Sequence, residues 1–296
     1  MEKADITPAL VSRLIAAQLP QWADLPITRI EVDGNDNTTF RLGEEMSVRL
    51  PSARRYVLQV EKEHRWLPIL ADHLPLAIPQ PLAKGVPGSG YPWPWSVYRW
   101  LKGSPATVAP IENEPEFANA LADFLTAMHR IDPEGGPPPG PHNFYRGGPL
   151  ATYDAETRHA IGALGNEIDA DAATELWEAG LGTTWRGSPV WIHGDVSAEN
   201  LLVEHGRLSA VIDFGGIAVG DPACDLTIAW TFLSGESRQA FQAHVPVDPA
   251  TWTRGRGWAL WKALITLVRT LKSNPERAAR CRVIIEEVIA EQKHAV

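Results

Sequence analysis

Apolar residues recur at helical spacing near the start of the chain and at strand spacing directly after it. The helical pattern spans residues 8–19 and follows a Thr-Pro pair, which is typical of a helix cap and first turn. Three short β-like runs, residues 28–32, 38–42 and 46–50, are separated by segments rich in Gly, Asp, Asn and Glu. The pattern predicts a lead-in helix followed by an antiparallel meander.

A second helix is predicted from residue 54 to about 66, where apolar positions recur three and seven residues apart. It should lie on the meander and be kinked or restarted at Pro68, because proline disrupts a helix interior. Residues 78–96 are rich in Pro and Gly, a composition that suits loops and edge strands. Residues 96–101 then read as a strand.

The chain changes from strand-rich to helix-rich after that strand, so we place a boundary there. Residues 1–101 are predicted to form a smaller α+β lobe, and residues 102–296 a larger, mainly helical lobe. A strand-rich insert between Val190 and Phe214 interrupts the helices of the second lobe. Its helical patterns cover residues 113–131, 150–163, 171–181, 236–243, 250–272 and 275–292, with a Pro/Gly loop over 132–149.

Composition narrows the function classes. The chain has 296 residues, of which 44% are hydrophobic, so it can bury a substantial core. With 27 basic and 36 acidic residues its net charge is −9, which argues against nucleic acid and favours a cationic substrate, unless the charge serves solubility alone. Cys224 and Cys281 form no disulfide framework and no metal-ligand spacing, which is typical of buried thiols in a reducing compartment.

The chain shows no membrane or export signal in its sequence. Its first residues lack a basic start followed by an apolar run, and no stretch approaches ~20 uninterrupted apolar residues. We therefore expect a cytoplasmic protein with no membrane partner.

The insert carries the candidate chemistry. If a turn is centred between His205 and Gly206, the flanking strands pair so that Asn200 and Asp213 meet at the open end of one hairpin. A carboxylate and an amide carbonyl are hard oxygen ligands, which suit Mg²⁺ together with water and phosphate oxygens. Asp195, on the loop that enters the hairpin, is placed to orient and deprotonate a hydroxyl.

These residues carry a family resemblance. His193-Gly194-Asp195 with Asn200, followed by Asp213-Phe214-Gly215, resembles the catalytic loop and metal motif of the protein-kinase-like fold, in the variant of the aminoglycoside phosphotransferase family. The resemblance implies a bilobal α+β fold that binds a nucleoside triphosphate in the first lobe.

The resemblance also implies individual roles. Asp195 would be the catalytic base, Asn200 and Asp213 the Mg²⁺ ligands, and His193 the residue that braces the loop. Asp225, in a downstream Asp-Pro-Ala-Cys-Asp motif, would hold the catalytic loop through backbone amides. Asp221, which opens the same motif, reads as a helix cap.

Three features indicate a small-molecule rather than a protein kinase. Only five residues separate Gly215 from Asp221, too few for a peptide-docking activation segment. Gly194 stands where protein kinases place an Arg that grips a phosphorylated loop. Ser197 stands where they place a Lys near the transferred phosphate, so Mg²⁺ and the first lobe should neutralise more of the charge.

In the first lobe the family pattern puts a Lys on the third strand, and the residue here is Arg49. We expect Arg49 to bind the α- and β-phosphates, the alternative being a surface arginine. Glu61 and Glu63 compete as its helix partner. Glu63 lies about 50° from the centre of the apolar stripe and Glu61 more than ~100°, which favours Glu63, although a solvated charge run is the alternative.

The remaining nucleotide contacts are less specific. No glycine-rich loop precedes the second strand, so the Asx-rich turn over residues 33–38, including Asn37 and Thr38, should cover the phosphates. Arg99, Trp100 and Leu101 match the hinge, whose backbone would meet the purine. The sequence leaves open whether the co-substrate is ATP or GTP.

The predicted reaction moves the γ-phosphoryl group to a hydroxyl of a small-molecule alcohol, most simply an aminoglycoside-like cationic or polyhydroxylated compound. The alternatives are a metabolic kinase acting on choline, a homoserine-like alcohol, a sugar or a macrolide, or a nucleotide-binding module without transfer activity. Antibiotic resistance is a family association only, and the oligomeric state stays open. Trp258 and Trp261 share a helical face that suits a core or a pocket. The candidate contacts for a cationic substrate are Asp195 itself and carboxylates of the C-terminal helices, for which a solvated face is the alternative: Glu156, Glu175, Glu178, Glu286, Glu287 and Glu291.

Overall fold

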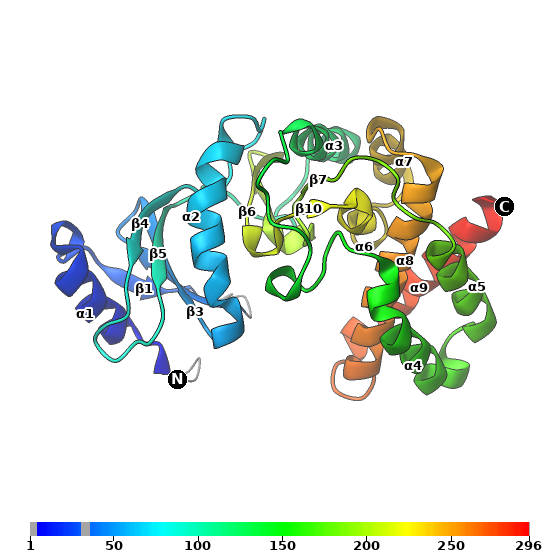
Figure 1. Cartoon of the computed structure of the whole chain (residues 1–296), viewed down its shortest axis with the longest axis horizontal. Coiled ribbons are helices and arrows are strands. Elements are labelled where there is room, and N and C mark those ends of the chain that lie inside the picture. Colours follow the sequence, from blue (N-terminus) through cyan, green and yellow to red (C-terminus); the bar gives the residue numbers. More distant parts are fainter. Residues whose placement is uncertain (1–4, 31–35, 296) are drawn as a thin grey trace. The chain divides into compact units, whose positions relative to one another are not determined.

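The computed structural model describes residues 5–30 and 36–295 and divides the chain into two compact units (Figure 1). The first unit holds the described residues up to Gly103 together with Ser209–Gly215. The second holds Ser104–Leu208 and the chain from Gly216 onward. The sequence-based boundary lies after residue 101 and leaves residues 209–215 in the second lobe.

The first unit is built on a five-stranded antiparallel sheet in the order β1-β2-β3-β5-β4. The edge strand β4 lies within the Pro/Gly-rich segment, and its proline is at the first strand position, where no ladder hydrogen bond is lost. The predicted meander is confirmed, although β1 is shorter than expected and residues 31 and 32 lie outside the described residues. The strands are β1 Ile27–Arg29, β2 Asn37–Leu42, β3 Met46–Pro51, β4 Pro81–Gly85 and β5 Trp95–Arg99.

Strand alternation decides which side chains of β3 reach the core. Val48 and Leu50 are fully buried in a cluster that includes Leu10 and Leu14 of helix α1 (Pro8–Gln18). Because successive side chains point to opposite faces, Arg49 between them points to the other face. There it meets helix α2 (Val57–Ala71), which continues through Pro68 instead of restarting at it.

The second unit is mainly helical. The six predicted helices are confirmed, and a short helical segment that the periodicity did not reveal follows Asp221: a 3₁₀ turn Pro222–Thr227 that leads into α6. The longest helix begins where the Asp248 side chain accepts a hydrogen bond from the Thr251 amide, with proline in the first turn. The helices are α3 Glu114–Arg130, α4 Asp154–Leu164, α5 Ala170–Leu181, α6 Ile228–Thr231, α7 Gly235–His244, α8 Pro249–Thr270 and α9 Pro275–Ala295.

Short strands position the candidate loop. β7 (Val190–Ile192) pairs with β10 (Ala218–Gly220), and β8 (Leu201–Glu204) pairs with β6 (Ser104–Pro105). Between β8 and β9 (Arg207–Val211) the predicted turn is present, with positive φ at both central residues as a tight hairpin turn requires. The loop of interest is therefore held between the end of β7 and the start of β8.

Among the helices in the described part of the chain, none is both long and apolar enough to cross a lipid bilayer.

Candidate active site

The loop after β7 is held by a buried carboxylate. Asp225 accepts hydrogen bonds from the amides of His193 (2.8 Å) and Gly194 (2.7 Å), and Asp225 and His193 are both fully buried. The Asp195 amide in turn donates to Nδ1 of His193 at 3.3 Å. This is the arrangement that the resemblance implies for Asp225 and His193, and it leaves little freedom to the backbone of Asp195.

Gly194 has a specific backbone requirement. Its φ is +82°, and a Cβ at this position would lie 2.4 Å from the carbonyl oxygen of Gly216. A side chain is therefore excluded both by conformation and by space. This explains in physical terms why the loop lacks the arginine found there in protein kinases.

Asp195 presents its carboxylate to solvent and to a lysine. Its side chain is 45% exposed, and Oδ1 lies 2.8 Å from Nζ of Lys262 on α8. Burial alone would raise the pKa of Asp195, but the attraction of Lys262, with smaller ones from Arg146 and His193, lowers it below its ordinary value. Asp195 is therefore ionised at neutral pH, as a hydrogen-bond acceptor for a hydroxyl must be.

The two predicted metal ligands each keep a free oxygen. Nδ2 of the nearly buried Asn200 donates to the Asp195 carbonyl at 3.0 Å, which assigns the other end of the amide to Oδ1. Asp213 adopts a left-handed backbone conformation with φ +65°, and its Oδ1 pairs with Arg49. Because Asn200 belongs to the second unit and Asp213 to the first, their juxtaposition stays a prediction.

Arg49 is the centre of a charged network in the first unit. Its guanidinium lies 3.5 Å from Glu63 Oε1 and 3.1 Å from Asp213 Oδ1, and it packs over the ring of Tyr98. Burial would lower the pKa of Arg49, but the two carboxylates outweigh it and raise the pKa. The Tyr98 hydroxyl donates to the second Glu63 oxygen. Arg49 is thus a fixed interior cation and not a surface arginine.

The helix carboxylates separate into two environments. Glu63 is buried against Arg49, whereas Glu61 is exposed and pairs with Lys84 at 2.7 Å. Lys62, between them, donates to the carbonyl of Gly215 at 2.7 Å, and burial lowers its pKa to about 8 although the neighbouring Glu63 and Asp213 oppose this. The contact with Glu63 is the one that helix geometry favours.

The other predicted nucleotide residues are placed unevenly. Of the turn over residues 33–38, residues 33–35 lie outside the described residues. Asn37 and Thr38 begin β2 and are buried, and within the described chain the Thr38 hydroxyl has no hydrogen-bond partner. The amides of Arg99 and Trp100 already donate to the carbonyls of Gln80 and Glu45. Of the three hinge residues, Leu101 therefore keeps the amide best suited to a base.

A small hollow beside Asp195 contains two cations that the sequence analysis missed. Trp258 and Trp261 are nearly buried on α8, and the guanidinium of Arg146 lies 5.4 and 4.6 Å from their ring centroids. A partial signal for Lys262 was present in the sequence, because this residue directly follows Trp261 on the apolar face of a predicted helix. No such signal marked Arg146, which lies in a loop with no periodic pattern. The hollow, here called the Asp195 hollow, is lined by Arg146, Gly194, Asp195, Cys224, Thr227, Trp258, Trp261 and Lys262.

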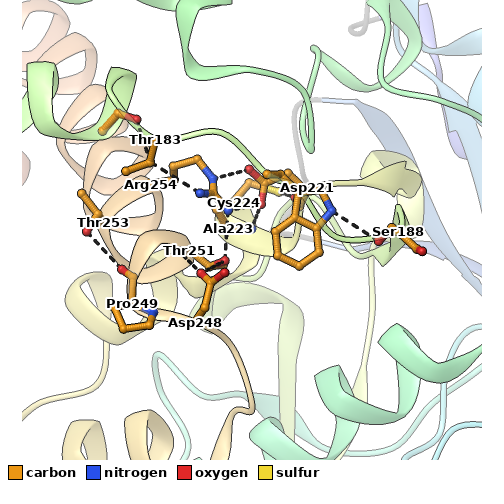
Figure 2. Close-up of polar contacts among 12 residues, drawn as sticks. Thr183, Ser188, Asp221, Ala223, Cys224, Asp248, Pro249, Thr251, Thr253 and Arg254 are labelled. Carbon is orange, nitrogen blue, oxygen red and sulfur yellow. Dashed lines mark hydrogen bonds and ion pairs between the residues drawn. The ribbon is translucent and has the colours of Figure 1, made fainter.

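A buried ion pair anchors the same helix. Arg254, two turns before Lys262, donates to Asp221 through Nε at 2.6 Å and through Nη2 at 3.3 Å (Figure 2). Asp221 also accepts from the Ala223 amide at 3.1 Å, which confirms that it caps the short helical turn. The downstream motif therefore holds the Asp195 loop through Asp225 and α8 through Asp221.

The acidic residues considered for a cationic acceptor lie elsewhere. Glu175 and Glu286 are exposed. The others already bind protein groups, namely Trp261 and Arg269 for Glu156, Arg158 for Glu178, Arg238 for Glu287 and Arg256 for Glu291. None of them lines the Asp195 hollow in the described structure.

Solved structures share this fold. A mutant aminoglycoside 2'-phosphotransferase-IIIa in complex with GDP matches with a TM-score of 0.75 at 19% identity, over 98% of this chain and 99% of that one. The GDP and kanamycin complex of an APH(2") enzyme matches with a TM-score of 0.71 at 19% identity, over 95% and 98%. A macrolide 2'-phosphotransferase from Brachybacterium faecium matches with a TM-score of 0.59 at 23% identity, over 94% and 98%.

The likeness to these structures shows a kinase-like α+β fold, with an antiparallel sheet unit and a helical unit. No curated protein matches the sequence significantly. The family model described as the phosphotransferase enzyme family matches residues 27–258, which include Arg49, Asp195 and Asp213. The chain therefore belongs to the phosphotransferase enzyme family.

Proposed function

We propose that this small-molecule kinase transfers the γ-phosphoryl group of ATP or GTP to a hydroxyl, with Asp195 as the catalytic base. The observation that carries the proposal is the Asp195 loop. A half-exposed carboxylate with a lowered pKa stands on a backbone that a buried aspartate holds through two amides. Such a group is suited to orient an acceptor hydroxyl by accepting its hydrogen bond.

Asp195 need not be a strong base to act in phosphoryl transfer. Phosphoryl transfer proceeds through a loose transition state, in which positioning and charge neutralisation supply most of the rate enhancement. Asp195 would hold the attacking oxygen in line and receive the proton as the new bond to phosphorus forms. An ionised carboxylate is required throughout, which agrees with the lowered pKa of Asp195.

Arg49 would bind the α- and β-phosphates. Glu63 and Tyr98 support this assignment, because the carboxylate pairs with the guanidinium and the ring packs against it. A buried cation without such partners would be costly. Among the described residues the Thr38 hydroxyl has no partner, so it offers a further donor for a phosphate oxygen. Asn37 and the backbone of Leu101 complete the nucleotide contacts that we propose.

The donor set fits Mg²⁺ in its chemistry. Asn200 keeps an amide oxygen and Asp213 a carboxylate oxygen, both hard ligands. Among the described residues no group of three or more His, Cys, Asp or Glu side chains is arranged to hold a metal, so water and phosphate oxygens would complete the shell. When bound, the ion would neutralise phosphate charge.

The acceptor class includes the aminoglycoside-like cationic or polyhydroxylated compounds expected from the resemblance, and the metabolic alcohols that compete with them. The solved structures of similar fold include a complex with GDP and kanamycin and a macrolide 2'-phosphotransferase, and these ligands and activities belong to those proteins. We favour polyhydroxylated acceptors. Their hydroxyls can hydrogen-bond to Asp195, and their carbon skeleton can pack against the aromatic side chains of α8.

The test is release of nucleoside diphosphate in the presence of Mg²⁺, with ATP and GTP in turn and with aminoglycosides, macrolides, choline and sugars as acceptors. Asp195→Asn keeps the shape of the side chain and should abolish acceptor-dependent release. Asp123→Asn is the matched control, because Asp123 is an exposed carboxylate that pairs with His244. Wild-type turnover in Asp195→Asn would refute the proposal.

A further inference from the structure

We propose that the acceptor carries an anionic group close to its reacting hydroxyl, and that Lys262 and Arg146 bind this group. The inference rests on the proposed phosphotransfer at Asp195 and names its acceptor class. It departs from the expectation of a cationic acceptor, which followed from the net charge of the whole chain.

The first step is the charge of the Asp195 hollow. Two cations, Lys262 and Arg146, face one carboxylate, Asp195. The thiol of Cys224 is neutral, because burial raises its pKa well above the ordinary value. The lining therefore carries a net positive charge.

The neighbouring carboxylates do not line the hollow, because each is bound to other protein groups. Asp225 is occupied by the amides of the catalytic loop, and Asp221 is paired with Arg254. Glu156 accepts a hydrogen bond from Trp261 Nε1 at 2.9 Å and lies 3.8 Å from Arg269. A cationic acceptor would meet two fixed positive charges and only the one carboxylate that it needs for catalysis.

The second step concerns Arg146. Its guanidinium packs over two tryptophan rings, and Tyr153 packs against Trp261 with ring centroids 4.1 Å apart. Within residues 5–30 and 36–295, no carboxylate forms an ion pair with Arg146. The stacking orients the guanidinium, so its donors are preorganised for an oxyanion. The buried Nε1–H of Trp258 also has no hydrogen-bond partner among the residues that the structure describes.

The third step is access. The hollow has a cavity volume of about 10 Å³, which admits about one water. An acceptor hydroxyl can use Oδ1 of Asp195 from within the hollow only if Nζ of Lys262 moves away from that oxygen. The lysine is 40% exposed on a flexible stem, so the movement is sterically possible.

Opening the Lys262–Asp195 pair separates two charges. An anionic acceptor compensates this cost, because its own anion replaces Asp195 as the partner of Lys262. Asp195 is then released for the hydroxyl at the same moment. A neutral acceptor offers no such exchange, and a cation opposes it. The acceptor that opens this site most readily is therefore a hydroxylated carboxylate or phosphate ester.

A different role for Lys262 must be distinguished by experiment. Ser197 stands where protein kinases place a lysine near the transferred phosphate, so Lys262 could supply that cation from α8. In that case its loss would lower kcat with every acceptor, and Arg146 would not share the effect. Our proposal instead requires both cations and an effect that depends on acceptor charge.

The test compares acceptors of one scaffold: glucose, glucosamine, glucuronate and glucose 6-phosphate, with kanamycin added as a larger cationic acceptor. We expect the highest kcat/KM with glucuronate or glucose 6-phosphate, and the two distinguish a carboxylate from a phosphate site. Lys262→Met and Arg146→Met should each lower kcat/KM for the anionic acceptor roughly 10- to 100-fold. Because both cations also act on Asp195, the readout is the ratio of kcat/KM for the anionic acceptor to that for glucose, which should fall in both variants and stay unchanged in the control. The matched control is Arg269→Met, which removes an exposed cation from the same helix.

A second arm measures binding without turnover. Sulfate and malonate should quench or shift tryptophan fluorescence in the wild type and in Arg269→Met, but not in Lys262→Met or Arg146→Met. If no acceptor releases nucleoside diphosphate while these anions still bind, the proposed phosphotransfer fails and the anion site stands. Preference for kanamycin or glucosamine, an equal loss of kcat with all acceptors in Lys262→Met, or absence of anion binding would each overturn the inference.

Discussion

Arg254 and Asp221 form a buried ion pair within the second unit, with both residues less than one-tenth exposed. The guanidinium spans both carboxylate oxygens and also reaches the hydroxyl of Thr251 at 3.0 Å (Figure 2). The pair connects α8, which carries Trp258 and Lys262, to the turn that carries Asp225. One contact therefore joins the helix of the Asp195 hollow to the turn that supports the Asp195 loop.

Replacing Arg254 by methionine should destabilise the protein strongly. Asp221 would remain as a buried carboxylate without its counter-charge, which costs about 3–5 kcal/mol of the free energy of unfolding. The measurement is urea unfolding followed by tryptophan fluorescence. Arg280→Met, which breaks an exposed pair with Glu276 on α9, should cost less than ~1 kcal/mol. Similar costs for the two variants would contradict the structural role of the buried pair.

Gly194→Ala should also destabilise the protein. The new Cβ would have to lie 2.4 Å from the Gly216 carbonyl and at a φ of +82°, so the loop must distort. The strained backbone alone costs about 1–2 kcal/mol, and the clash adds to it. Thermal unfolding should show a lower Tm, together with loss of acceptor-dependent turnover.

Gly162→Ala is the matched glycine control for this effect. Gly162 lies in α4 with open space around its Cβ position, so alanine should be neutral or stabilising by up to ~1 kcal/mol. Equal Tm values for the two alanine variants would show that Gly194 has no special backbone requirement.

Glu63→Gln should weaken use of the nucleotide. The change removes the carboxylate charge that lies 3.5 Å from the Arg49 guanidinium while keeping the shape of the side chain. We expect kcat/KM for the nucleoside triphosphate to fall roughly tenfold or more. Glu61→Gln affects only the exposed pair with Lys84 and should leave this value nearly unchanged. A larger loss in Glu61→Gln would reverse the assignment of the two glutamates.

Lys62 should titrate near pH 8. Burial lowers its pKa from the ordinary 10.5 to about 8, against the attraction of Glu63 and Asp213. Between pH 8 and 10.5 the unfolded chain binds more protons at Lys62 than the folded protein does. The free energy of unfolding therefore rises with pH across that window. Below pH 8 the lysine is protonated in both states and the penalty is constant.

The measurement is NMR of carbon-13 at Cε of the lysines, with Lys62→Arg to assign the signal by its absence. Lys62→Met should also raise the free energy of unfolding more at pH 7 than at pH 10, since the wild type carries the buried charge only at the lower pH. A Lys62 titration above pH 10 would contradict the burial seen in the structure.

Local pattern was sufficient for much of this protein. The alternation of apolar residues in β3, the helical periodicities and the Thr, Asn and Asp caps predict most elements, because these signals act within a few residues. The motif that contains Asp195, Asn200 and Asp213 is likewise read from a short stretch of sequence, and the roles assigned to these residues stay predictions. Glu63 was identified from local pattern too, since its angle on α2 already points it toward the sheet.

Only the tertiary structure decided the character of the Asp195 hollow. Lys262 and Arg146 are separated from Asp195 by 67 and 49 positions, and nothing in their local sequence marks them as its neighbours. Net charge and exposed glutamates suggested a cationic acceptor, yet water and salt largely screen exposed charges that lie more than about 10 Å away, so the groups next to Asp195 set the local potential. The fold brings two cations from a loop and a helix to one carboxylate, and that spatial arrangement sets the local potential.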